Sequence, residues 1–457
     1  MLVIVSDLHL TDGSSGTTIK ADAFRILRNQ LRTLAYAASW AKNGTYKPIE
    51  EIDLVLLGDG LDVIRSWSYS GSPSAVMPWS DTSSSGFAQR VGQITNAIMT
   101  HNTEGLAILK SMSSGEGVTV PLEALPTQLS EREYYARLAS VPRNPVKVRI
   151  HYQVGNHDWF YHLRGPAFDA IRQGVVDTMG LANDPKEPFP HCPTESSCLQ
   201  QVYRKHRVLA KHGDEYDRFN YEGKRDASSL GDAIVVMLIN RFADEVKNWL
   251  TDPSLGTCVS GLREVDNVRP ILMIPVWINS LLNRTCTQSQ AEVVKRVWDS
   301  LVDEFLNIPF VRERKSFWNC FNSVNELEWG LKFSQGVRIQ TLSSVVESVR
   351  SWMHADDGSL AQKAFQDATS LSQAVDFIVC GHTHQFEIVP LQATIPRSQI
   401  YVNSGTWRRV YEEAQGQPGK HEFVGQDVMA YVALYAEHER SGRPFETWSG
   451  SLGPPVI

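Results

Sequence analysis

The sequence has 457 residues and a formal net charge of −7 at pH 7. This acidic balance excludes the overall basic character that marks dedicated nucleic-acid-binding proteins. The length exceeds what one compact core usually holds, so we expect a core domain interrupted by inserted segments.

The chain starts directly in an apolar run at residues 2–5, which predicts a buried strand. This start leaves no room for the positively charged and apolar regions of a secretory signal peptide. No later run approaches the roughly 18 to 20 uninterrupted apolar residues of a transmembrane helix. We therefore expect a cytoplasmic protein whose six cysteines are reduced thiols.

Four further apolar runs are similar to the first, and polar residues able to bind a metal follow every run. The five runs span residues 2–5, 54–57, 148–154, 208–210 and 377–379, and the polar residues after them are Asp7, His9, Asp59, Asn156, His157, His212, His382 and His384. In layered α/β folds, the loops at the carboxyl ends of strands converge on one face. The pattern therefore predicts one shared site built from segments that lie far apart in the sequence.

The first interruption of the core, residues 66–145, is predicted to be a lid-like insertion beside this site. It opens with a stretch rich in Ser, Gly and Trp, continues through a helical pattern near residues 89–111 and closes through several prolines. Its aromatic residues Trp67, Tyr69 and Trp79 have two interpretations. They either stack on a substrate or anchor the segment to the core, and anchoring is the favoured interpretation.

The second interruption, residues 215–374, is predicted to be a helical cap. Apolar residues recur at helical spacing over residues 234–250 and again over residues 293–305. The apolar run at residues 271–278 is too short to span a bilayer and carries Pro275, so we expect it to be buried core.

The residue types at the strand ends suit a pair of divalent cations. Imidazole suits zinc, iron and manganese-like ions, whereas carboxylate and amide oxygens suit harder cations. Two-metal hydrolases hold their cations roughly 3.5 to 4 Å apart, which requires a bridging carboxylate. Asp59 lies between the other ligands in chain order and is the candidate bridge. We expect Mn²⁺ as the metal, with Fe, Zn and Co as alternatives.

In their order along the chain, the motifs resemble those of the calcineurin-like metallophosphoesterases. These motifs are Asp7-Leu8-His9, Gly58-Asp59-Gly60-Leu61-Asp62, Gly155-Asn156-His157-Asp158, His212-Gly213-Asp214 and Gly381-His382-Thr383-His384. The resemblance implies an α/β fold, a four-layer αββα sandwich of two packed mixed sheets flanked by helices. The metallophosphoesterase core would comprise residues 1–65, 146–214 and 375–457.

The same resemblance implies a role for each motif residue. The first metal would be held by Asp7, His9 and His384, the second by Asn156, His212 and His382, and the bridge between them would be Asp59. His157 would be a catalytic residue that binds no metal. Three further carboxylates either accept hydrogen bonds from these histidines or serve as turn and helix-cap residues; they are Asp62, Asp158 and Asp214. The loop at residues 403–406 is expected to be structural.

The expected activity is hydrolysis of a phosphoester by a metal-activated water, with His157 and Asp59 as the catalytic residues. A phosphodiester or pyrophosphate of a nucleotide or small molecule is the favoured substrate. The alternatives are a DNA or RNA exonuclease of the same superfamily, a phosphomonoesterase and, least favoured, a non-catalytic scaffold. The second insertion begins directly after Asp214, at a position similar to that of the helical cap in UDP-2,3-diacylglucosamine hydrolases, which implies that it selects the substrate.

Overall fold

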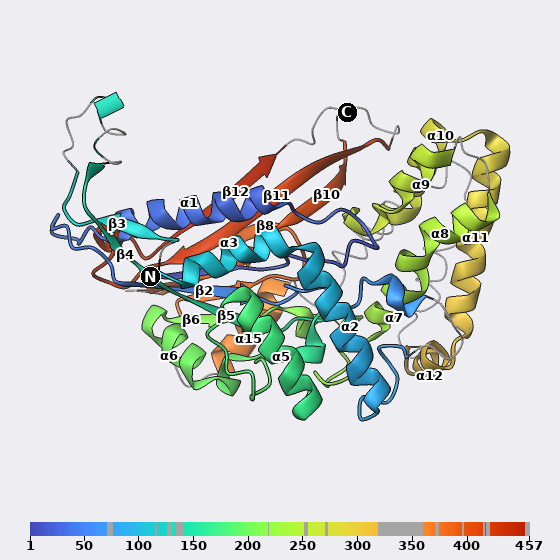
Figure 1. The fold of residues 1–457 in the computed structure, drawn as a ribbon, viewed down its shortest axis with the longest axis horizontal. Coiled ribbons are helices and arrows are strands. Elements are labelled where there is room, and N and C mark those ends of the chain that lie inside the picture. The colour runs from blue at the N-terminus through green and yellow to red at the C-terminus, as the bar shows by residue number, and fades with distance from the viewer. Residues whose placement is uncertain are drawn as a thin grey trace.

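The structure is a computed structural model that describes residues 1–70, 76–115, 117–125, 130, 132–133, 137, 140–217, 219–250, 255–269, 273–318, 360–370, 374–394, 397–414, 416 and 421–452. Its described part combines helices with two mixed sheets and one short pair of strands, β3 (Thr119–Pro121) and β4 (Arg143–Pro145) (Figure 1). The expected α/β class is therefore confirmed.

The larger sheet positions three of the five motif loops. Its described strands are β1 (Leu2–Val5), β2 (Glu51–Leu57), β5 (Lys147–Gln153), β10 (Arg408–Glu413), β11 (Phe423–Leu434) and β12 (Phe445–Leu452). The strand order is β10-β11-β1-β2-β5, with β12 beside β11. Because β1, β2 and β5 are parallel, their carboxyl ends lie at one edge of the sheet, where the following loops meet.

The smaller sheet positions the other two motif loops. Its described strands are β6 (Val208–Ala210), β7 (Phe377–Cys380), β8 (Phe386–Thr394) and β9 (Arg397–Ser404), in the order β6-β7-β9-β8. The first three strands in this order are parallel, and β8 is antiparallel to β9. All five apolar runs of the sequence therefore form strands, as predicted, and each strand ends beside the expected polar residues.

The two sheets pack face to face, which explains why β1 is apolar at every position. Successive side chains of a strand point to opposite faces of its sheet. Leu2 and Ile4 share a buried cluster with Val379 of the smaller sheet, whereas Val3 and Val5 belong to a second cluster, with helices on the outer face. A strand buried on both faces needs a continuous apolar run, and this is the pattern seen in the sequence.

Helices cover the outer face of the larger sheet. They are α1 (Ala21–Ala38), α2 (Ser85–His101), α3 (Thr103–Ser113) and α5 (Pro166–Met179). On α1, the buried residues Phe24, Leu27, Leu31 and Leu34 recur at helical spacing and form the face that joins this core. Helices α2 and α3 confirm the helical pattern near residues 89–111, which divides at Asn102. Residues of both helices join the apolar cluster of this layer.

Two other helices contact the smaller sheet. Residues of α6 (Ser197–His206) complete the cluster between the sheets, and α15 (Leu360–Ser370) packs on the outer face of the smaller sheet. The small residues Ala361, Ala364 and Ala368 allow α15 to lie close to Ile378 of β7. Helix α15 lies within the range predicted for the cap, and its apolar stripe packs on this sheet.

The second insertion is helical, as predicted. Its described elements are α7 (Leu230–Ile234), the π-helical η5 (Val235–Ile239), α8 (Asn240–Trp249), α9 (Gly256–Leu262), the 3₁₀ turn η7 (Val265–Asn267), α10 (Ile274–Thr285), α11 (Gln288–Asn307) and α12 (Pro309–Trp318). Helices α8 to α11 gather at the right-hand end in Figure 1, opposite the β3–β4 pair. Their apolar faces, including Phe242 and Trp298, continue the cluster that covers the larger sheet.

Aromatic side chains of residues 66–145 anchor this segment. Tyr69 is buried, and Trp79 stacks on Phe310 of α12 with ring centroids 5.0 Å apart. An aromatic pair of this kind adds roughly 0.5 to 1.5 kcal/mol to the area that it buries. The first insertion is therefore fastened to the second, in agreement with the favoured interpretation of these aromatics.

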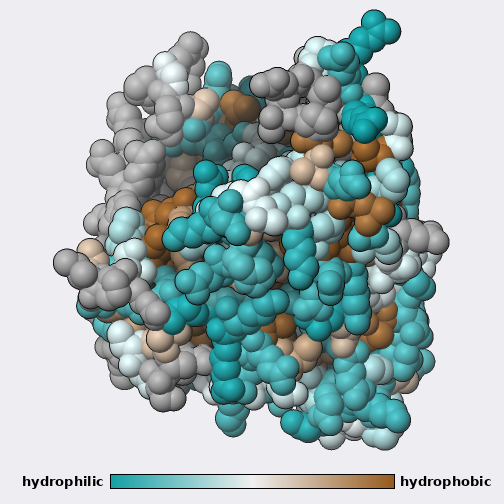
Figure 2. All heavy atoms as spheres, turned by 90° about the vertical axis from the view of Figure 1, so that its left-hand side faces the viewer, coloured by the Kyte–Doolittle hydropathy of each residue, from teal (hydrophilic) through white to brown (hydrophobic). Residues whose placement is uncertain are grey.

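No helix among the described residues is suited to cross a membrane. None of their helices combines the length and apolar character needed to cross a bilayer. The face seen in Figure 2 is largely hydrophilic, with apolar side chains in small separate groups. Within the apolar run at residues 271–278, Met273, Ile274 and Trp277 are buried, as predicted, whereas residues 271–272 lie outside the described part.

The buried histidine at the end of α6 predicts a loss of stability in acid. Burial lowers the pKa of His206 from its ordinary value of 6.5 to about 3, and neither ring nitrogen has a hydrogen-bond partner among the described residues. Below pH 6.5 the unfolded chain therefore takes up a proton that the folded chain does not, and the free energy of unfolding falls. Between pH 6.5 and 5 we expect a loss of about 2 kcal/mol from this residue.

Urea unfolding at pH 7, 6 and 5 measures this contribution. A His206→Gln variant should lose less stability than the parent chain over the same range, whereas the exposed control His438→Gln should behave like the parent. Equal losses for His206→Gln and the parent would contradict the prediction.

Candidate metal centre

The backbone at the strand ends is held in an uncommon conformation. Asp7, His9, Asp59, His382 and His384 all have positive φ angles, between 43° and 70°. Such a conformation costs of order 1 to 3 kcal/mol for a residue other than glycine and persists only where its surroundings impose it. Five expected ligands share this strain, which is typical of side chains aimed at a common point.

Hydrogen bonds between the motif loops impose these conformations. The amide of Asp7 donates to the Gly58 carbonyl at 3.1 Å, and the amide of His9 donates to the Asp59 carbonyl at 2.8 Å. The amide of His382 donates to Asp7 Oδ2 at 3.0 Å. The loops after β1, β2 and β7 therefore form one rigid unit.

Two glycines let these loops approach the carboxylates. A Cβ atom at Gly155 would overlap Asp59 Oδ1, and a Cβ atom at Gly381 would overlap Asp7 Oδ2. Both positions therefore require a residue without a side chain. The loop at residues 403–406 supports the same turns, because Asn403 donates to the Gly381 carbonyl at 2.7 Å and Thr406 donates to the Asp7 carbonyl at 2.8 Å.

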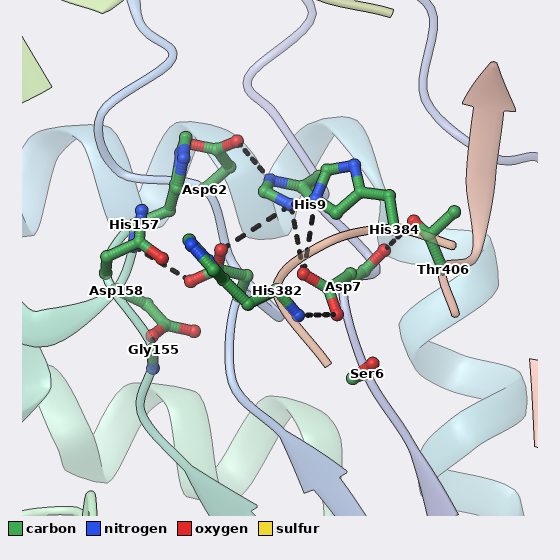
Figure 3. Close-up of polar contacts among 12 residues, drawn as sticks. Ser6, Asp7, His9, Asp62, Gly155, His157, Asp158, His382, His384 and Thr406 are labelled. Carbon is green, nitrogen blue, oxygen red and sulfur yellow. Dashed lines mark hydrogen bonds and ion pairs between the residues drawn. The ribbon is translucent and has the colours of Figure 1, made fainter. Parts of the chain in front are cut away.

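One group of potential ligands consists of Asp7, His9 and His384. In Figure 3 these side chains point toward one another. His384 Nε2 lies 3.2 Å from Asp7 Oδ1 and 2.9 Å from His9 Nε2. Three buried donor atoms so close together could hold one cation. This is the set that the family resemblance implied for the first metal.

A second group consists of Asp7, Asp59 and His212, with Asn156 beside it. His212 Nε2 lies 3.2 Å from Asp59 Oδ2 and 3.2 Å from Asn156 Oδ1. Asp59 Oδ2 is also 3.6 Å from His9 Nε2, so this oxygen lies between the two groups. Asp7 Oδ1 has a similar position, 3.6 Å from His9 Nε2 and 4.0 Å from His212 Nε2. Both carboxylates therefore face both groups, and the bridging role of Asp59 stays a prediction.

His382 approaches this second group in a different way. Its ring centroid lies 5.4 Å from that of His212, but its Nε2 atom contacts Asp217 Oδ2 at 3.0 Å. Histidines that bind metals usually donate their other ring N–H to a carboxylate. Since Asp217 takes Nε2, the nitrogen left for a cation is Nδ1. Sequence reasoning missed Asp217, although it lies only five residues after His212.

The other histidines are oriented in the same manner. His9 Nδ1 contacts Asp62 Oδ2 at 2.7 Å, and His212 Nδ1 lies 2.9 Å from the carbonyl oxygen of Leu57. Each contact leaves Nε2 facing the carboxylates. Asp62 therefore has the orienting role that was one of its two predicted interpretations.

Within the described ranges, Asp158 and Asp214 have partners other than histidines. Asp158 accepts hydrogen bonds from the amides of Gly60 and Gly155 and from the Tyr152 hydroxyl, and burial raises its pKa to about 7. Asp214 forms an ion pair with Arg225 at 2.7 Å. Of the two predicted interpretations of these carboxylates, the contacts therefore do not favour the one as histidine partners, because amides, a hydroxyl and a guanidinium occupy their oxygens. Asp158 has the alternative turn role.

His157 lies at the rim of the centre. Its Nδ1 atom contacts Asp62 Oδ1 at 2.8 Å, and its backbone amide donates to Asp59 Oδ1 at 2.8 Å. Burial alone would lower the pKa of His157, but the charges of Asp62 and Asp59 outweigh it and raise the pKa to about 9. Asp62 contacts both His157 and His9, and it thereby links His157 to the first group of ligands.

The donor set fits divalent cations. Asp7 Oδ1 is buried and meets no donor in hydrogen-bonding geometry within the described residues. Burial would raise the pKa of Asp7, yet the charge of His212 and the contacts of His384 and His9 together outweigh it and hold the pKa well below its usual range. Burial would likewise lower the pKa of His212, and the charges of Asp59 and Asp7 raise it well above its usual range. A proton on this histidine compensates two buried carboxylates, and metal loading is expected to release it.

The positively charged side chain of Arg269, a residue of the second insertion, reaches the centre. Arg269 donates to His384 Nδ1 from Nε at 3.0 Å and from Nη2 at 2.7 Å. Burial, followed by the charge of Arg408, lowers the pKa of Arg269 to about 9, so the guanidinium keeps its charge at neutral pH. No local sequence signal marks Arg269, because it lies in the middle of an insertion without a motif.

No model of a known protein family matches the chain, and no curated protein sequence matches it significantly.

Proposed function

We propose that the chain is a metallophosphoesterase of the calcineurin-like kind, built as a four-layer αββα sandwich with a helical cap insertion. The layers are supported by the packing of helices α1, α3 and α5 on one sheet, of the two sheets on each other, and of α15 on the second sheet. The cytoplasmic location expected from the sequence is part of this proposal.

One observation carries the proposal: donor atoms from all five motif loops converge on a single buried cluster. The residues that meet there are Asp7, His9, Asp59, Asn156, His212 and His384, with His382 beside His212. Polar turns arranged by chance would not point six side chains toward one place. They would also not place carboxylates and carbonyls where these orient the histidines of the cluster. Two divalent cations held there, with Mn²⁺ expected, would lower the pKa of a water molecule and neutralise phosphate oxygens.

The chain itself supplies the proton of the leaving group. Asp62 holds Nδ1 of His157, so Nε2 is the nitrogen left to face a substrate. Only 14% of the His157 side chain is exposed, which excludes most water from it. Proton transfer of this kind contributes typically 10²- to 10⁴-fold to turnover.

Arg269 is the residue most suited to bind a substrate phosphate. Its segment is fastened to the core by a β-bridge between Val268 and Tyr411 and by Asp266, which pairs with Arg65 and Arg408 at 2.8 Å each. Two guanidinium groups therefore pair with one carboxylate, and Arg269 donates to the backbone carbonyl of the same residue at 2.6 Å. The surplus positive charge favours an anion, and a guanidinium matches the geometry of phosphate oxygens. This charge supports a phosphodiester or pyrophosphate of a nucleotide or small molecule as the substrate.

An Arg269→Ala variant is expected to raise KM by about 10- to 100-fold, since a hydrogen bond to a charged group is worth about 1.5 to 3 kcal/mol. Steady-state kinetics with a phosphodiester, together with the metal content of each sample, measure this effect. The control is Arg263→Ala, which removes an exposed arginine paired with Asp244 at 3.3 Å. An unchanged KM with unchanged metal content would remove Arg269 from phosphate binding.

The proposal is tested by hydrolysis of bis-p-nitrophenyl phosphate and p-nitrophenyl phosphate. The protein is stripped of metal, assayed, and assayed again after Mn²⁺ is added. Metal-dependent turnover that prefers the diester supports a phosphodiesterase, whereas preference for the monoester would make the protein a phosphatase. Two bound metals without turnover of these or of nucleotide and pyrophosphate substrates would contradict the proposed activity.

A further inference from the structure

A second cluster of metal-binding side chains lies outside the candidate metal centre. It consists of His162 at the end of the 3₁₀ turn η2 (Trp159–His162), His191, and Glu195 at the end of the 3₁₀ turn η3 (Pro193–Glu195). One ligand atom from each lies within 4.8 Å of the others. Two imidazoles and one carboxylate form a donor set that zinc accepts.

The spacing of these atoms suits a tetrahedral ion. With metal–ligand bonds of about 2.0 to 2.2 Å, the ligands of a tetrahedral zinc ion lie roughly 3.3 to 3.6 Å from one another. His162 Nε2 lies 3.5 Å from Glu195 Oε2, and His191 Nδ1 lies 3.2 Å from the same oxygen. Little movement is therefore needed for all three residues to bind one ion.

The orientation of His162 is typical of a metal ligand. Its Nδ1 atom contacts Asp226 Oδ1 at 2.5 Å, and its Nε2 atom faces Glu195. A carboxylate on the far nitrogen of a metal-binding histidine fixes the tautomer and increases the basicity of the ligand. Asp226 comes from the start of the second insertion, so the cluster joins this insertion to the core.

Glu195 is also held in place before any ion binds. Its Oε2 atom accepts hydrogen bonds from the backbone amides of His191 at 2.8 Å and Cys192 at 3.3 Å. These bonds fix the carboxylate between the two imidazoles, whose centroids are 5.6 Å apart.

We propose that His162, His191 and Glu195 bind a zinc ion that is separate from the candidate metal centre and fastens the second insertion to the core. The three protein ligands leave a fourth position for water. His162 lies five residues after His157, so the zinc also supports the loop that carries this histidine. The site differs from the candidate metal centre in its residues and does not depend on the proposed activity.

Zinc stoichiometry tests this site. The full chain is stripped with a chelator, loaded with Zn²⁺, freed of excess metal by gel filtration and analysed by elemental mass spectrometry. His191→Ala and Glu195→Gln are each expected to bind one zinc ion fewer per chain than the parent, whatever the candidate metal centre holds. The exposed control His438→Ala should match the parent.

Affinity and folding give a second measurement. Competition with a zinc-binding dye should show that Asp226→Asn weakens the affinity of this zinc about 10- to 100-fold, the usual effect of losing a partner that orients a ligand. Melting temperatures without zinc establish that each variant is folded. Unchanged zinc stoichiometry in both folded variants, His191→Ala and Glu195→Gln, would overturn the proposal.

Discussion

Asp59→Asn is expected to lose metal and, with it, all measurable phosphodiesterase turnover. The new side chain can keep its oxygen at the Oδ1 position, where it accepts the hydrogen bond from the His157 amide. Its amide nitrogen then replaces Oδ2, the atom 3.2 Å from His212 Nε2 and 3.6 Å from His9 Nε2. An NH₂ group cannot bind a cation there. The loss of metal affinity should exceed the roughly 10- to 100-fold typical of residues that only orient a ligand.

The matched control is Asp53→Asn, on the same strand, β2. Asp53 is also a buried carboxylate, but it pairs with Arg149 and His151, outside the candidate metal centre. This variant is expected to lower stability while keeping the metal content of the parent. Elemental analysis and turnover of bis-p-nitrophenyl phosphate distinguish the two variants. If Asp59→Asn kept both its metal and its activity, Asp59 would not be a ligand.

His157→Ala is expected to lower kcat by about 10²- to 10⁴-fold while leaving the metal content unchanged. The side chain of His157 contacts Asp62 and appears in none of the contacts that join Asp7, Asp59 and His212. Its removal takes away the proton donor but not a ligand. The measurements are steady-state kinetics and elemental analysis of the same sample.

The control for this variant is His101→Ala, which removes an exposed histidine at the end of α2. It should have the kcat and the metal content of the parent. Equal kcat for His157→Ala and the parent would exclude His157 from the reaction, and a loss of metal in His157→Ala would instead indicate a structural role. These two results separate proton transfer from support of the centre.

Much of the candidate metal centre could be predicted because its signals are local. A buried strand requires a short apolar run, and a ligand at its carboxyl end follows within a few residues. Asp7, Asp59 and His212 all satisfy this rule, and the structure brings them together. Because parallel strands place their carboxyl ends at one edge of a sheet, no further information is needed to predict that these ligands meet.

The partners of the carboxylates could not be predicted in the same way. Three of the motifs end in an aspartate, namely Asp62, Asp158 and Asp214. In the described contacts, only the first of these three meets histidines. The difference arises from the direction in which each turn leaves its strand, and this direction depends on φ angles and on neighbours from other loops. Arg225, which pairs with Asp214, belongs to the second insertion, where no motif indicated it.

The sequence by itself therefore determined the α/β class, the strands and the set of residues that meet at the candidate metal centre, because continuous apolar runs and strand-end positions are encoded within short segments. Only the tertiary structure decided that Asp217 takes Nε2 of His382, that Arg269 reaches His384, and that His162 meets His191 and Glu195. These contacts join residues of separate loops, whose meeting depends on how the insertions pack against the sheets. Packing of this kind is a property of the whole chain, since each contact requires the burial of apolar surface contributed by many distant residues.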